Sequence, residues 1–570
     1  MTATPSTSLT WRSIGIILLY GGTLLAVNLG GAGRALTYHE VVFAQPAREM
    51  LDTGDWIIPR MLGVPDTHKP PLTSWLIAIA IQIFGTSEWA VRLPSVLAAL
   101  ATAVWLAFVA ARWFGDRVGC LTGLIHLTMY YVLQFGRLAE ADIFLVLFVA
   151  LAMGIFMLAN VTPRDESTPR DESTPRDESS NPAGPAARWL PPAFYLACGL
   201  AFMTKSLIGL AFIGSGCGLF ALWQRERRVW RFLFDPLGLL LFITCLLAWP
   251  FAAYLTYPQF LDDQIKHHLG RFQGVWGEDE PIYCYLYDIP RCALPWSLAA
   301  SWGIVVGWRQ GWLRGPFGRF ALCWVVPGTI LLTVSQWRHY HYVAPLMPPF
   351  AWLAAIGMVD FVERRHAQSS ARLGWRLPLV LNLLLAIGAW VVWMIPNLRG
   401  REPILALIGF TAAVCWLIAW CEQQRRPHAH LAAIFGLAWV LAAGAFQFVI
   451  PHYDLYSQLA AFAERVNRDK PEGVPLHMVD LKEDQLTWYL RQPLVRVDDP
   501  DTLDKGNLAN RQSVYLVAPQ ATIDELAKVG RLDIIERSPV APRRIESLRV
   551  CFARWQRPLT ARPVSFNQSP

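Results

Sequence analysis

The sequence has few charged residues and no paired cysteine motif. Only 16% of its 570 residues are charged, against about 25% in an average soluble protein, and 54% are hydrophobic. The ten cysteines form neither a CxxC pair nor a zinc-finger spacing, and six of them lie inside apolar runs, where buried free thiols are expected. This composition argues against an ordinary soluble domain and against a structural zinc site.

The first apolar run, residues 14–29, lacks a small-residue cleavage site, so we interpret it as an uncleaved membrane anchor and not as a removed signal. The net charge is +7, but the basic residues lie in short loops between apolar runs. That pattern sets membrane orientation and is not typical of a nucleic-acid patch.

Apolar runs long enough to span a bilayer recur along the chain. A span needs roughly 20 mainly apolar residues, and about thirteen segments qualify, although several are short. Residues 71–84 suit a re-entrant or interfacial helix better. The thirteen candidates are 11–30, 91–113, 118–133, 142–158, 189–203, 207–223, 234–254, 293–308, 320–334, 343–362, 377–395, 404–420 and 431–450.

Arginines in alternate loops predict the orientation. With the N-terminus inside, every inside loop carries arginine, as the positive-inside rule requires. The loops 38–75, 134–141, 204–206, 256–292 and 335–342 then lie outside, and so does everything after residue 450. The predicted fold is an all-α polytopic membrane protein with a small extracytoplasmic α/β domain at its C-terminus.

We predict two domains, a transmembrane catalytic domain over 1–450 and the α/β domain over 451–570. The first contains an outside loop, 31–75, and a cytoplasmic segment, 162–187, which is expected to be disordered because its Pro-Arg-Asp-Glu-Ser-Thr repeat has no hydrophobic residue to bury. In the second, 457–467 and 523–529 are predicted helices, and the predicted strands are 476–479, 494–497, 513–517, 531–535 and 548–555.

Polar, charged and aromatic residues gather in the outside loops. In the first loop, Glu40 could accept a proton and His39 could act as a base, but Glu40 could equally cap a helix or pair with Arg34 or Arg48. Prolines after Lys69 fix its ammonium next to the bilayer, which suits a lipid phosphate, although a snorkelling lysine would look the same.

Later loops add further candidates. Glu140 and Asp142 stand at the mouth of a span, where acidic residues need partners or a function, although Asp142 could also be an N-cap. Lys205 could contact a phosphate or mark only a turn. Further along the chain are His268 with Arg271, whose fork binds oxygens bidentately, and a donor-rich stretch from Arg338 to Tyr342. Histidines near carboxylates permit a divalent metal but do not specify one.

Stretches of the first 350 residues together resemble the GT-C type membrane glycosyltransferases, in the group of 4-amino-4-deoxy-L-arabinose transferase and the protein O-mannosyltransferases. The matching stretches are Tyr38-His39-Glu40, Ala47-Arg48-Glu49-Met50-Leu51, Gly54-Asp55-Trp56, Pro59-Arg60, Lys69-Pro70-Pro71-Leu72 with Trp75, Phe84-Gly85, Glu88, Arg92-Leu93-Pro94, Met203-Thr204-Lys205, Ala248-Trp249-Pro250, His268 with Arg271-Phe272, Leu294-Pro295-Trp296, and Arg338 to Tyr342 with Pro345.

This resemblance implies a glycosyltransferase of the bacterial cytoplasmic membrane. Its donor would be a polyprenyl-phosphate sugar, and its acceptor a lipid A-like glycolipid or a protein at the outer face. No nucleotide sugar and no nucleic acid would be involved. By the resemblance, the donor phosphate is held by Lys69, Arg271 and Tyr342, with Lys205 and Arg338. The catalytic candidates are Glu40, Asp142, Glu140 and His39. Further site candidates are His268, Arg48 and Arg60.

One departure from the family concerns His39, which stands where the family usually has a catalytic aspartate. An imidazole can also take a proton, so base catalysis remains open. Two alternatives follow: a transporter or flippase for a lipid-linked sugar, and an inactive relative that only binds lipid. A transporter favours inverted repeats and broken helices at mid-membrane, and the sequence has no such repeat.

Overall fold

The structure is a computed structural model of the chain. It describes residues 8–31, 34–161, 187–272, 280–335, 338–368, 376–395, 398, 401–452, 456–481, 485–497, 513–538 and 550–556. These fall into two compact units. The first unit comprises Met1–Val27, Thr67–Leu76 and Arg92–Val449, and the second comprises Asn28–Asp66, Ile77–Val91 and Ile450–Pro570. The first outside loop is therefore divided between the units.

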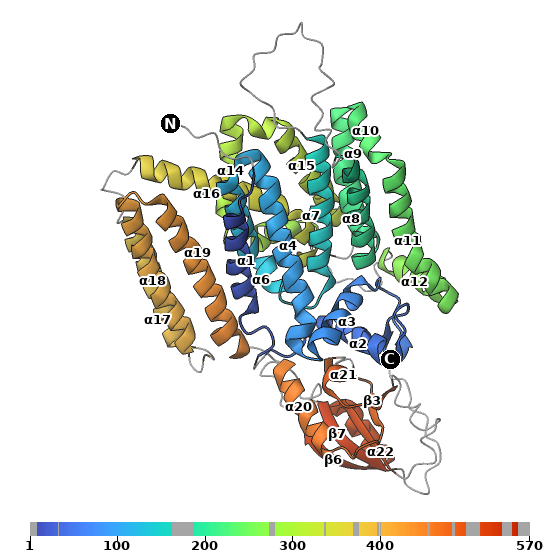
Figure 1. Cartoon of the computed structure of the whole chain (residues 1–570). Helices are drawn as coiled ribbons and strands as arrows, with labels where there is room; N and C mark the ends of the chain where they lie inside the picture. Colours follow the sequence, from blue (N-terminus) through green and yellow to red (C-terminus); the bar gives the residue numbers. More distant parts are fainter. Residues whose placement is uncertain are drawn as a thin grey trace. The chain divides into compact units, whose positions relative to one another are not determined.

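Helices make up nearly all of the first unit (Figure 1). The α-helices of the chain are α1 (Trp11–Ala26), α2 (Tyr38–Thr53), α3 (Leu72–Phe84), α4 (Glu88–Phe114), α5 (Asp116–Thr128), α6 (Tyr130–Phe135), α7 (Ala141–Asn160), α8 (Leu190–Lys205), α9 (Leu207–Gln224), α10 (Arg227–Leu233), α11 (Pro236–Thr256), α12 (Phe260–Phe272), α13 (Cys284–Cys292), α14 (Ser297–Gln310), α15 (Pro316–Val334), α16 (Pro348–Gln368), α17 (Arg376–Met394), α18 (Arg401–Gln423), α19 (Pro427–Gly444), α20 (Tyr456–Asp469), α21 (Gln485–Tyr489) and α22 (Gln520–Val529).

Short 3₁₀ or π turns complete the helical part: η1 (Ala187–Trp189), η2 (Trp312–Arg314), η3 (Tyr340–Leu346), η4 (Ala445–Val449) and η5 (Ile450–His452). Of these, η3 follows α15 and carries Tyr342, a candidate site residue.

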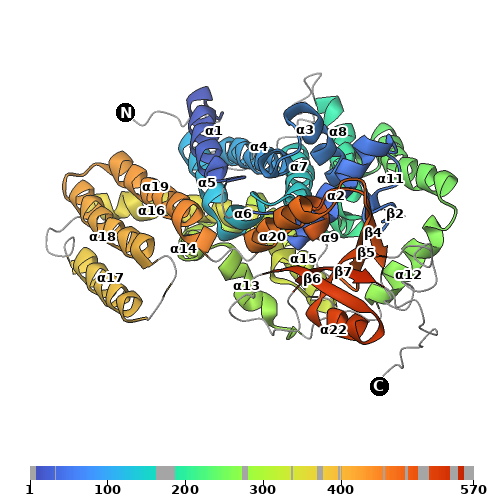
Figure 2. The same ribbon diagram turned by 90° about the horizontal axis from the view of Figure 1, so that it is seen from below.

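Helix α7 is the most buried of the long apolar helices, with neighbours α8 and α9 (Figure 2). Its 20 residues give it a length of about 30 Å, the thickness of a bilayer's hydrocarbon core. Helices α14 and α16 approach each other closely because Gly303 and Gly357 have no side chain. A Cβ atom at either position would overlap a backbone carbonyl of the other helix. Small residues at helix contacts are typical of membrane bundles.

Each predicted span lies mainly on helix, and two spans are interrupted within their length. Segment 118–133 breaks at Met129 between α5 and α6, and segment 343–362 bends by 69° between η3 and α16. Among the described residues, seven helices are long and apolar enough to cross a membrane, or eight with the bent pair, beside three shorter apolar helices. The total of about thirteen spans stays a prediction, while the helical membrane architecture is confirmed.

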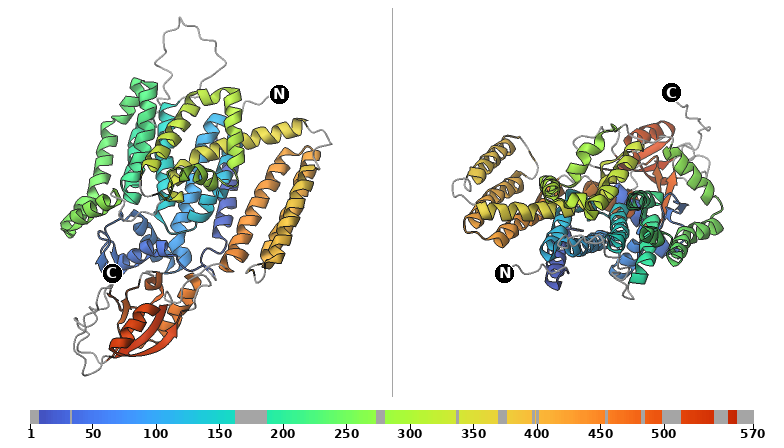
Figure 3. Two further views of the ribbon diagram at one scale, coloured as in Figure 1. Left: turned by 180° about the vertical axis from the view of Figure 1, so that it is seen from behind. Right: turned by 90° about the horizontal axis from the view of Figure 1, so that it is seen from above.

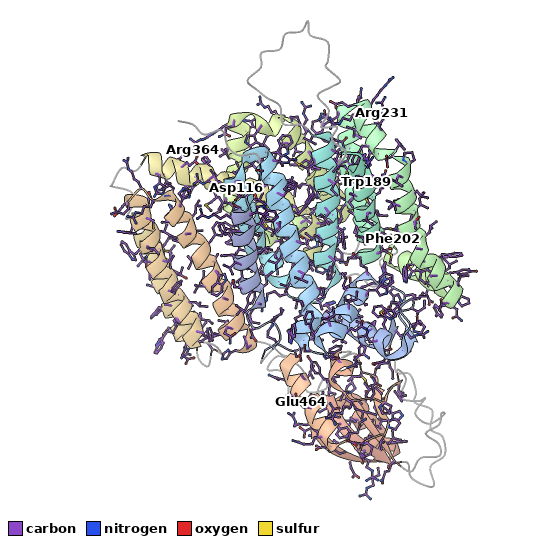
Figure 4. The ribbon with its side chains drawn as sticks, viewed as in Figure 1. Asp116, Trp189, Phe202, Arg231, Arg364 and Glu464 are labelled. Carbon is purple, nitrogen blue, oxygen red and sulfur yellow. The ribbon has the colours of Figure 1, made fainter. Side chains whose placement is uncertain are left out.

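The arginine-rich ends of the helices lie together. Arg231 of α10 and Arg364 of α16 lie at one end of the helical bundle, whereas Phe202 of α8 lies nearer the other end (Figure 4). Lys205 follows Phe202 by less than one turn and ends α8. The predicted phosphate-binding lysine is therefore at the end away from those arginines, as the loop analysis predicted.

The second unit contains a five-stranded sheet of order β4-β3-β5-β7-β6 (Figure 3). Its strands are β3 (Leu476–Val479), β4 (Leu494–Val497), β5 (Val514–Pro519), β6 (Arg531–Arg537) and β7 (Val550–Gln556), and β3 pairs parallel to both β4 and β5. Helices α20 and α21 cover one face and α22 the other. The predicted α/β domain is thus confirmed.

Helix α2 of the first outside loop is 16 residues long. A capping box starts it, in which Thr37 and Glu40 bond each other's backbone N–H, and Gly54 ends it in a left-handed conformation with φ of 74°. A hairpin of β1 (Arg60–Met61) and β2 (Val64–Pro65) follows. Helix α2 packs against α21 of the same unit.

Candidate active site

The functional site is built around an ion pair between two helix ends. Helices α7 and α8 run antiparallel and pack together, so the start of α7 and the end of α8 meet. There Nζ of Lys205 lies 2.7 Å from Oδ1 of Asp142, and the two side chains are only 19% and 8% exposed. Charges taken out of water require such pairing, because desolvation of either one alone is costly.

The 3₁₀ segment η3 adds two aromatic side chains to this pair. The ammonium of Lys205 lies 4.9 Å from the centre of the Tyr342 ring, which is within cation–π range. His341 packs edge-on to Tyr342 at 4.8 Å, and its charge acts on the Asp142 carboxylate. The predicted residues Asp142, Lys205 and Tyr342 are thus brought together from three separate stretches of chain.

Lys69 belongs to the same unit and acts on the same carboxylate. Its positive charge contributes to the electrostatic environment of Asp142, and its side chain is half-buried. The stretch before it is tied down by Gln264 of α12, whose amide donates to the Thr67 carbonyl. Pro70 and Pro71 then restrict the backbone after it. A cation that is held in this way keeps its position when a ligand arrives.

The described residues of this cluster include two ammonium groups and two carboxylates. Lys69 and Lys205 face one paired carboxylate, Asp142, and the charge of Glu140 also acts on Lys205. Glu140 is buried and stands directly before α7. An anion with several oxygen atoms, such as a phosphate monoester or diester, matches this combination of ammonium groups and a phenol.

A second group of side chains holds η3 in place. The Gln134 amide donates to the Tyr340 hydroxyl at 2.7 Å, and the Arg291 guanidinium lies 4.3 Å from the Tyr340 ring centre. Phe135 packs against His341 at 5.3 Å. Gln134 and Arg291 were not predicted from the sequence, because neither stands in a motif and each acts through a neighbour.

Arg137 is another contributor that the sequence analysis did not select. It is fully buried and donates to the carbonyls of Leu25, at 3.1 Å, and Val27 at the end of α1, with its guanidinium 3.6 Å from the Phe446 ring. It thereby anchors the turn that leads to Glu140. An arginine in a short outside loop of an apolar chain was the available signal for it.

Arg338 lies just before η3 and directs its guanidinium toward backbone. It donates to the Glu280 carbonyl at 2.7 Å and to the Thr333 carbonyl at 3.3 Å. In this arrangement it fixes the entry into η3, and its predicted contact with the donor phosphate stays a prediction.

The candidates of the first outside loop lie in the second unit. Glu40 is fully buried, and its carboxylate accepts from the Thr37 N–H at 2.9 Å, so the capping interpretation describes what the structure contains. Arg48 donates to the carbonyls of Thr487 and Trp488 and lies 4.9 Å from the Trp488 ring centre. Arg60 pairs with Asp55 at 3.4 Å. His39 is exposed. Catalytic roles for Glu40 and His39 stay predictions.

Two further candidates cannot be placed. His268 and Arg271 stand in α12, but their side chains lie outside the described residues. Elsewhere in the described part of the chain, no three His, Cys, Asp or Glu side chains gather closely enough to hold a metal ion. Cys284 and Cys292 are both buried and free.

Comparison with known proteins places this geometry in context. Residues 68–166 match the model of the dolichyl-phosphate-mannose-protein mannosyltransferase family. The undecaprenyl phosphate-alpha-4-amino-4-deoxy-L-arabinose arabinosyl transferase of Yersinia enterocolitica is 28% identical over 418 residues, which is 71% of each chain. The enzyme of the same name from Erwinia tasmaniensis is 26% identical over 72% of each chain.

The fold is similar to solved structures over almost its whole length. The crystal structure of ArnT from Cupriavidus metallidurans bound to undecaprenyl phosphate has a TM-score of 0.73 with 19% identity and covers 95% of this chain and 97% of that one. The Archaeoglobus fulgidus oligosaccharyltransferase has a TM-score of 0.50 with 13% identity, over 89% of this chain and 69% of that one. Both the helical unit and the C-terminal sheet thus have a counterpart in the first of these folds.

Proposed function

We propose, from the premise that this chain is a GT-C type membrane glycosyltransferase, that it moves a sugar from undecaprenyl phosphate to a lipid A-like glycolipid. The predicted family resemblance and the predicted enzyme class are confirmed by the matches in sequence and fold. The sugar to test first is 4-amino-4-deoxy-L-arabinose, because the relatives are named for it.

We place the reaction at the outer face of the bacterial cytoplasmic membrane, with the N-terminus in the cytoplasm. The arginine-bearing ends of α10 and α16 would then face the cytoplasm, in line with the positive-inside rule (Figure 4). The Lys205–Asp142 pair ends up at the outer side, where a lipid-linked sugar would be presented.

The observation that carries the proposal is the convergence of Lys69, Lys205 and Tyr342 around one paired carboxylate. In the reaction, an acceptor oxygen attacks C1 of the sugar and the bond from C1 to the phosphate oxygen breaks. The electron pair stays with the phosphate, so negative charge grows there. Preorganised ammonium and hydroxyl groups lower the barrier when they are aimed at such developing charge.

Asp142 acts in this proposal as a positioning residue. Its carboxylate takes one N–H of Lys205, and the remaining two N–H groups of that ammonium are left to serve phosphate oxygens. Without Asp142, Lys205 would have more rotamers available, and fewer of them would point at the donor.

The acceptor must also lose a proton. Of the four predicted proton acceptors, Glu140 and Asp142 lie in the unit that carries these cations. Because Asp142 is committed to Lys205, we assign the proton to Glu140. The variant Glu140→Gln is then expected to bind donor normally and to turn over at least about a hundredfold more slowly.

Turnover of the purified full chain tests the proposal. The assay supplies undecaprenyl phosphate-linked 4-amino-4-deoxy-L-arabinose and lipid A, and product is measured by mass spectrometry. Lys69→Ala is expected to lose about 10²–10³ in rate, whereas Lys528→Ala, which changes an exposed lysine of α22, keeps the wild-type rate. Full turnover by Lys69→Ala contradicts the proposed phosphate role.

A proteoliposome assay separates the enzyme from the flippase alternative. The lipid-linked donor is placed in the inner leaflet of vesicles that contain no acceptor. Its appearance in the outer leaflet is followed with time. A transferase moves no donor under these conditions, while a flippase does.

A further inference from the structure

A cavity of the helical unit shares no lining residue with the proposed active site. It lies among α1, α5 and α19, which are neighbours in the fold, and its volume is about 850 Å³. In Figure 2 these three helices lie side by side. All three begin at this cavity's polar end, with residues Arg12, Arg117 and His428 in their first turns.

The cavity changes character along its length. Its mouth is lined by Arg12, Arg117 and His428, and its deeper part by apolar side chains such as Ile16, Leu124 and Phe435. Along α19 it reaches from His428 to Val440, which is about 18 Å at 1.5 Å per residue. One leaflet of hydrocarbon is about 15 Å thick, so the cavity matches one leaflet and the start of the headgroup layer.

At the mouth, more basic than acidic side chains are available to bind a ligand. Its carboxylate, Asp116, is already occupied, because it accepts from the Thr10 N–H at 2.7 Å and from the Ser13 hydroxyl at 2.9 Å. Arg117 pairs with Glu363 at 2.7 Å. Arg12 and His428 are both exposed at the mouth, and Arg425 and Arg426 directly precede α19. An anion would therefore meet a positive rim.

Two hydrogen bonds close the far end. The Tyr20 hydroxyl donates to the Phe435 carbonyl at 2.8 Å, and the Trp439 indole donates to the Thr23 hydroxyl at 3.2 Å. Helices α1 and α19 are thus joined by hydrogen bonds near the apolar end of the cavity, and the cavity lies between them near its mouth. A wedge of this shape between two membrane helices needs something apolar to fill it.

We propose that this cavity binds one anionic phospholipid, with its phosphate at Arg12 and His428 and an acyl chain along α1 and α19. Basic pockets between membrane helices on the cytoplasmic side commonly recognise anionic headgroups. The bound lipid would join the three consecutive helices α17, α18 and α19 to the rest of the helical unit. This site is separate from the sugar-transfer site and rests on the proposed function only for its placement on the cytoplasmic side.

Gly436 offers a way to test the acyl-chain part. It lines the cavity, and a Cβ atom built there meets no atom within 4 Å. The variant Gly436→Leu should therefore fill the space without a clash and with better helix propensity than glycine. Gly409 of α18 is a matched control, because its Cβ also meets open space and it lies outside the cavity.

Native mass spectrometry of the delipidated full chain, titrated with phosphatidylglycerol, tests the proposal. Saturating undecaprenyl phosphate is present throughout, so that the transfer site is occupied. Wild-type protein should bind one phosphatidylglycerol at least about tenfold more tightly than phosphatidylethanolamine. The double variant Arg12→Glu/His428→Glu should lose about tenfold or more, and Arg231→Glu, at the same end of the bundle, should lose nothing.

Gly436→Leu should lower the lipid occupancy as well, while Gly409→Leu keeps it. The proposal is overturned if the mouth variant binds phosphatidylglycerol like the wild type, if Arg231→Glu loses as much as the mouth variant, or if Gly436→Leu retains full occupancy.

Discussion

Lys205 Nζ lies 2.7 Å from Asp142 Oδ1, although 63 residues separate them in the chain. One lies at the end of α8 and the other at the start of α7, so the antiparallel packing of these helices creates the pair. If Asp142 works only by orienting Lys205, their effects on turnover should not add.

A double-mutant cycle checks this coupling. We expect Lys205→Ala to reduce kcat/KM about a hundredfold and Asp142→Ala by about tenfold or more, with the double variant no slower than Lys205→Ala alone. Kinetic constants of the four purified proteins give the coupling energy. Additive losses would show that Asp142 acts independently of Lys205, for example as the base. Thermal unfolding of all four is the necessary control, because either single variant leaves a buried charge unpaired.

The support of η3 by Tyr340 gives a second prediction. Tyr340→Phe removes the hydrogen bond from Gln134 but keeps the ring against Arg291. One neutral hydrogen bond is worth about 0.5–1.5 kcal/mol, so we expect kcat/KM to fall about two- to tenfold. Gln134→Leu should cause a similar loss, and the two variants combined should be no worse than either. Kinetics of the three variants check this, and an unchanged rate in Tyr340→Phe contradicts it.

Arg48 should stabilise the contact between α2 and α21. Its guanidinium donates to the carbonyls of Thr487 and Trp488, so Arg48→Met keeps much of the packing against Trp488 and loses both bonds. We expect local destabilisation by about 3–6 kcal/mol, since two bonds are lost and hydrogen bonds to charged groups are worth about 1.5–3 kcal/mol each. Hydrogen–deuterium exchange should show faster exchange in residues 486–490. Arg465→Met, which loses an ion pair elsewhere in the same domain, serves as the control.

Asp288 in α13 gives a pH-dependent prediction. Burial raises the pKa of its carboxyl group above the ordinary value, against the opposing effect of Arg291, whose nearest nitrogen is 3.8 Å away. A raised carboxyl pKa means that the folded state prefers the protonated form. Stability from this residue is therefore present at low pH and is lost as the pH rises through the raised value.

The variant Asp288→Asn mimics the protonated form. We expect its Tm to exceed that of the wild type by about 1–2 °C at pH 7. Below about pH 4, where the wild-type carboxyl is itself protonated, the difference should vanish. Thermal unfolding across this pH range provides the measurement, and a gain that is independent of pH contradicts the assignment.

Hydrophobic periodicity was sufficient to find most elements. Strands β3 and β4 begin and end at the predicted residues, because short apolar segments bounded by turn residues specify their own limits. The break at Met129 and the bend before α16 were not predicted. In both places an apolar run continues across the interruption, so composition alone contains no boundary signal.

The site was only partly predictable for a similar reason. Lys69, Lys205 and Tyr342 became candidates because polar and aromatic residues gather in the outside loops, and the family resemblance assigned them to the donor phosphate. Gln134 and Arg291 were not found, because they act through Tyr340 and their position depends on how α6 and α13 pack. Glu40 shows the opposite limit: the sequence permitted both capping and catalysis, and only coordinates reveal the capping box.

The central claim is that Lys69, Lys205 and Tyr342 together recognise the phosphate of a polyprenyl donor. Its most direct test compares equilibrium binding of undecaprenyl phosphate with binding of undecaprenol, which has the same chain and no phosphate. Wild-type protein should prefer the phosphate by about a hundredfold or more, because charged hydrogen bonds are worth about 1.5–3 kcal/mol each. In the variant Lys69→Ala/Lys205→Ala this preference should nearly disappear while undecaprenol binding is unchanged. Wild-type preference for the phosphate in that double variant would contradict the account.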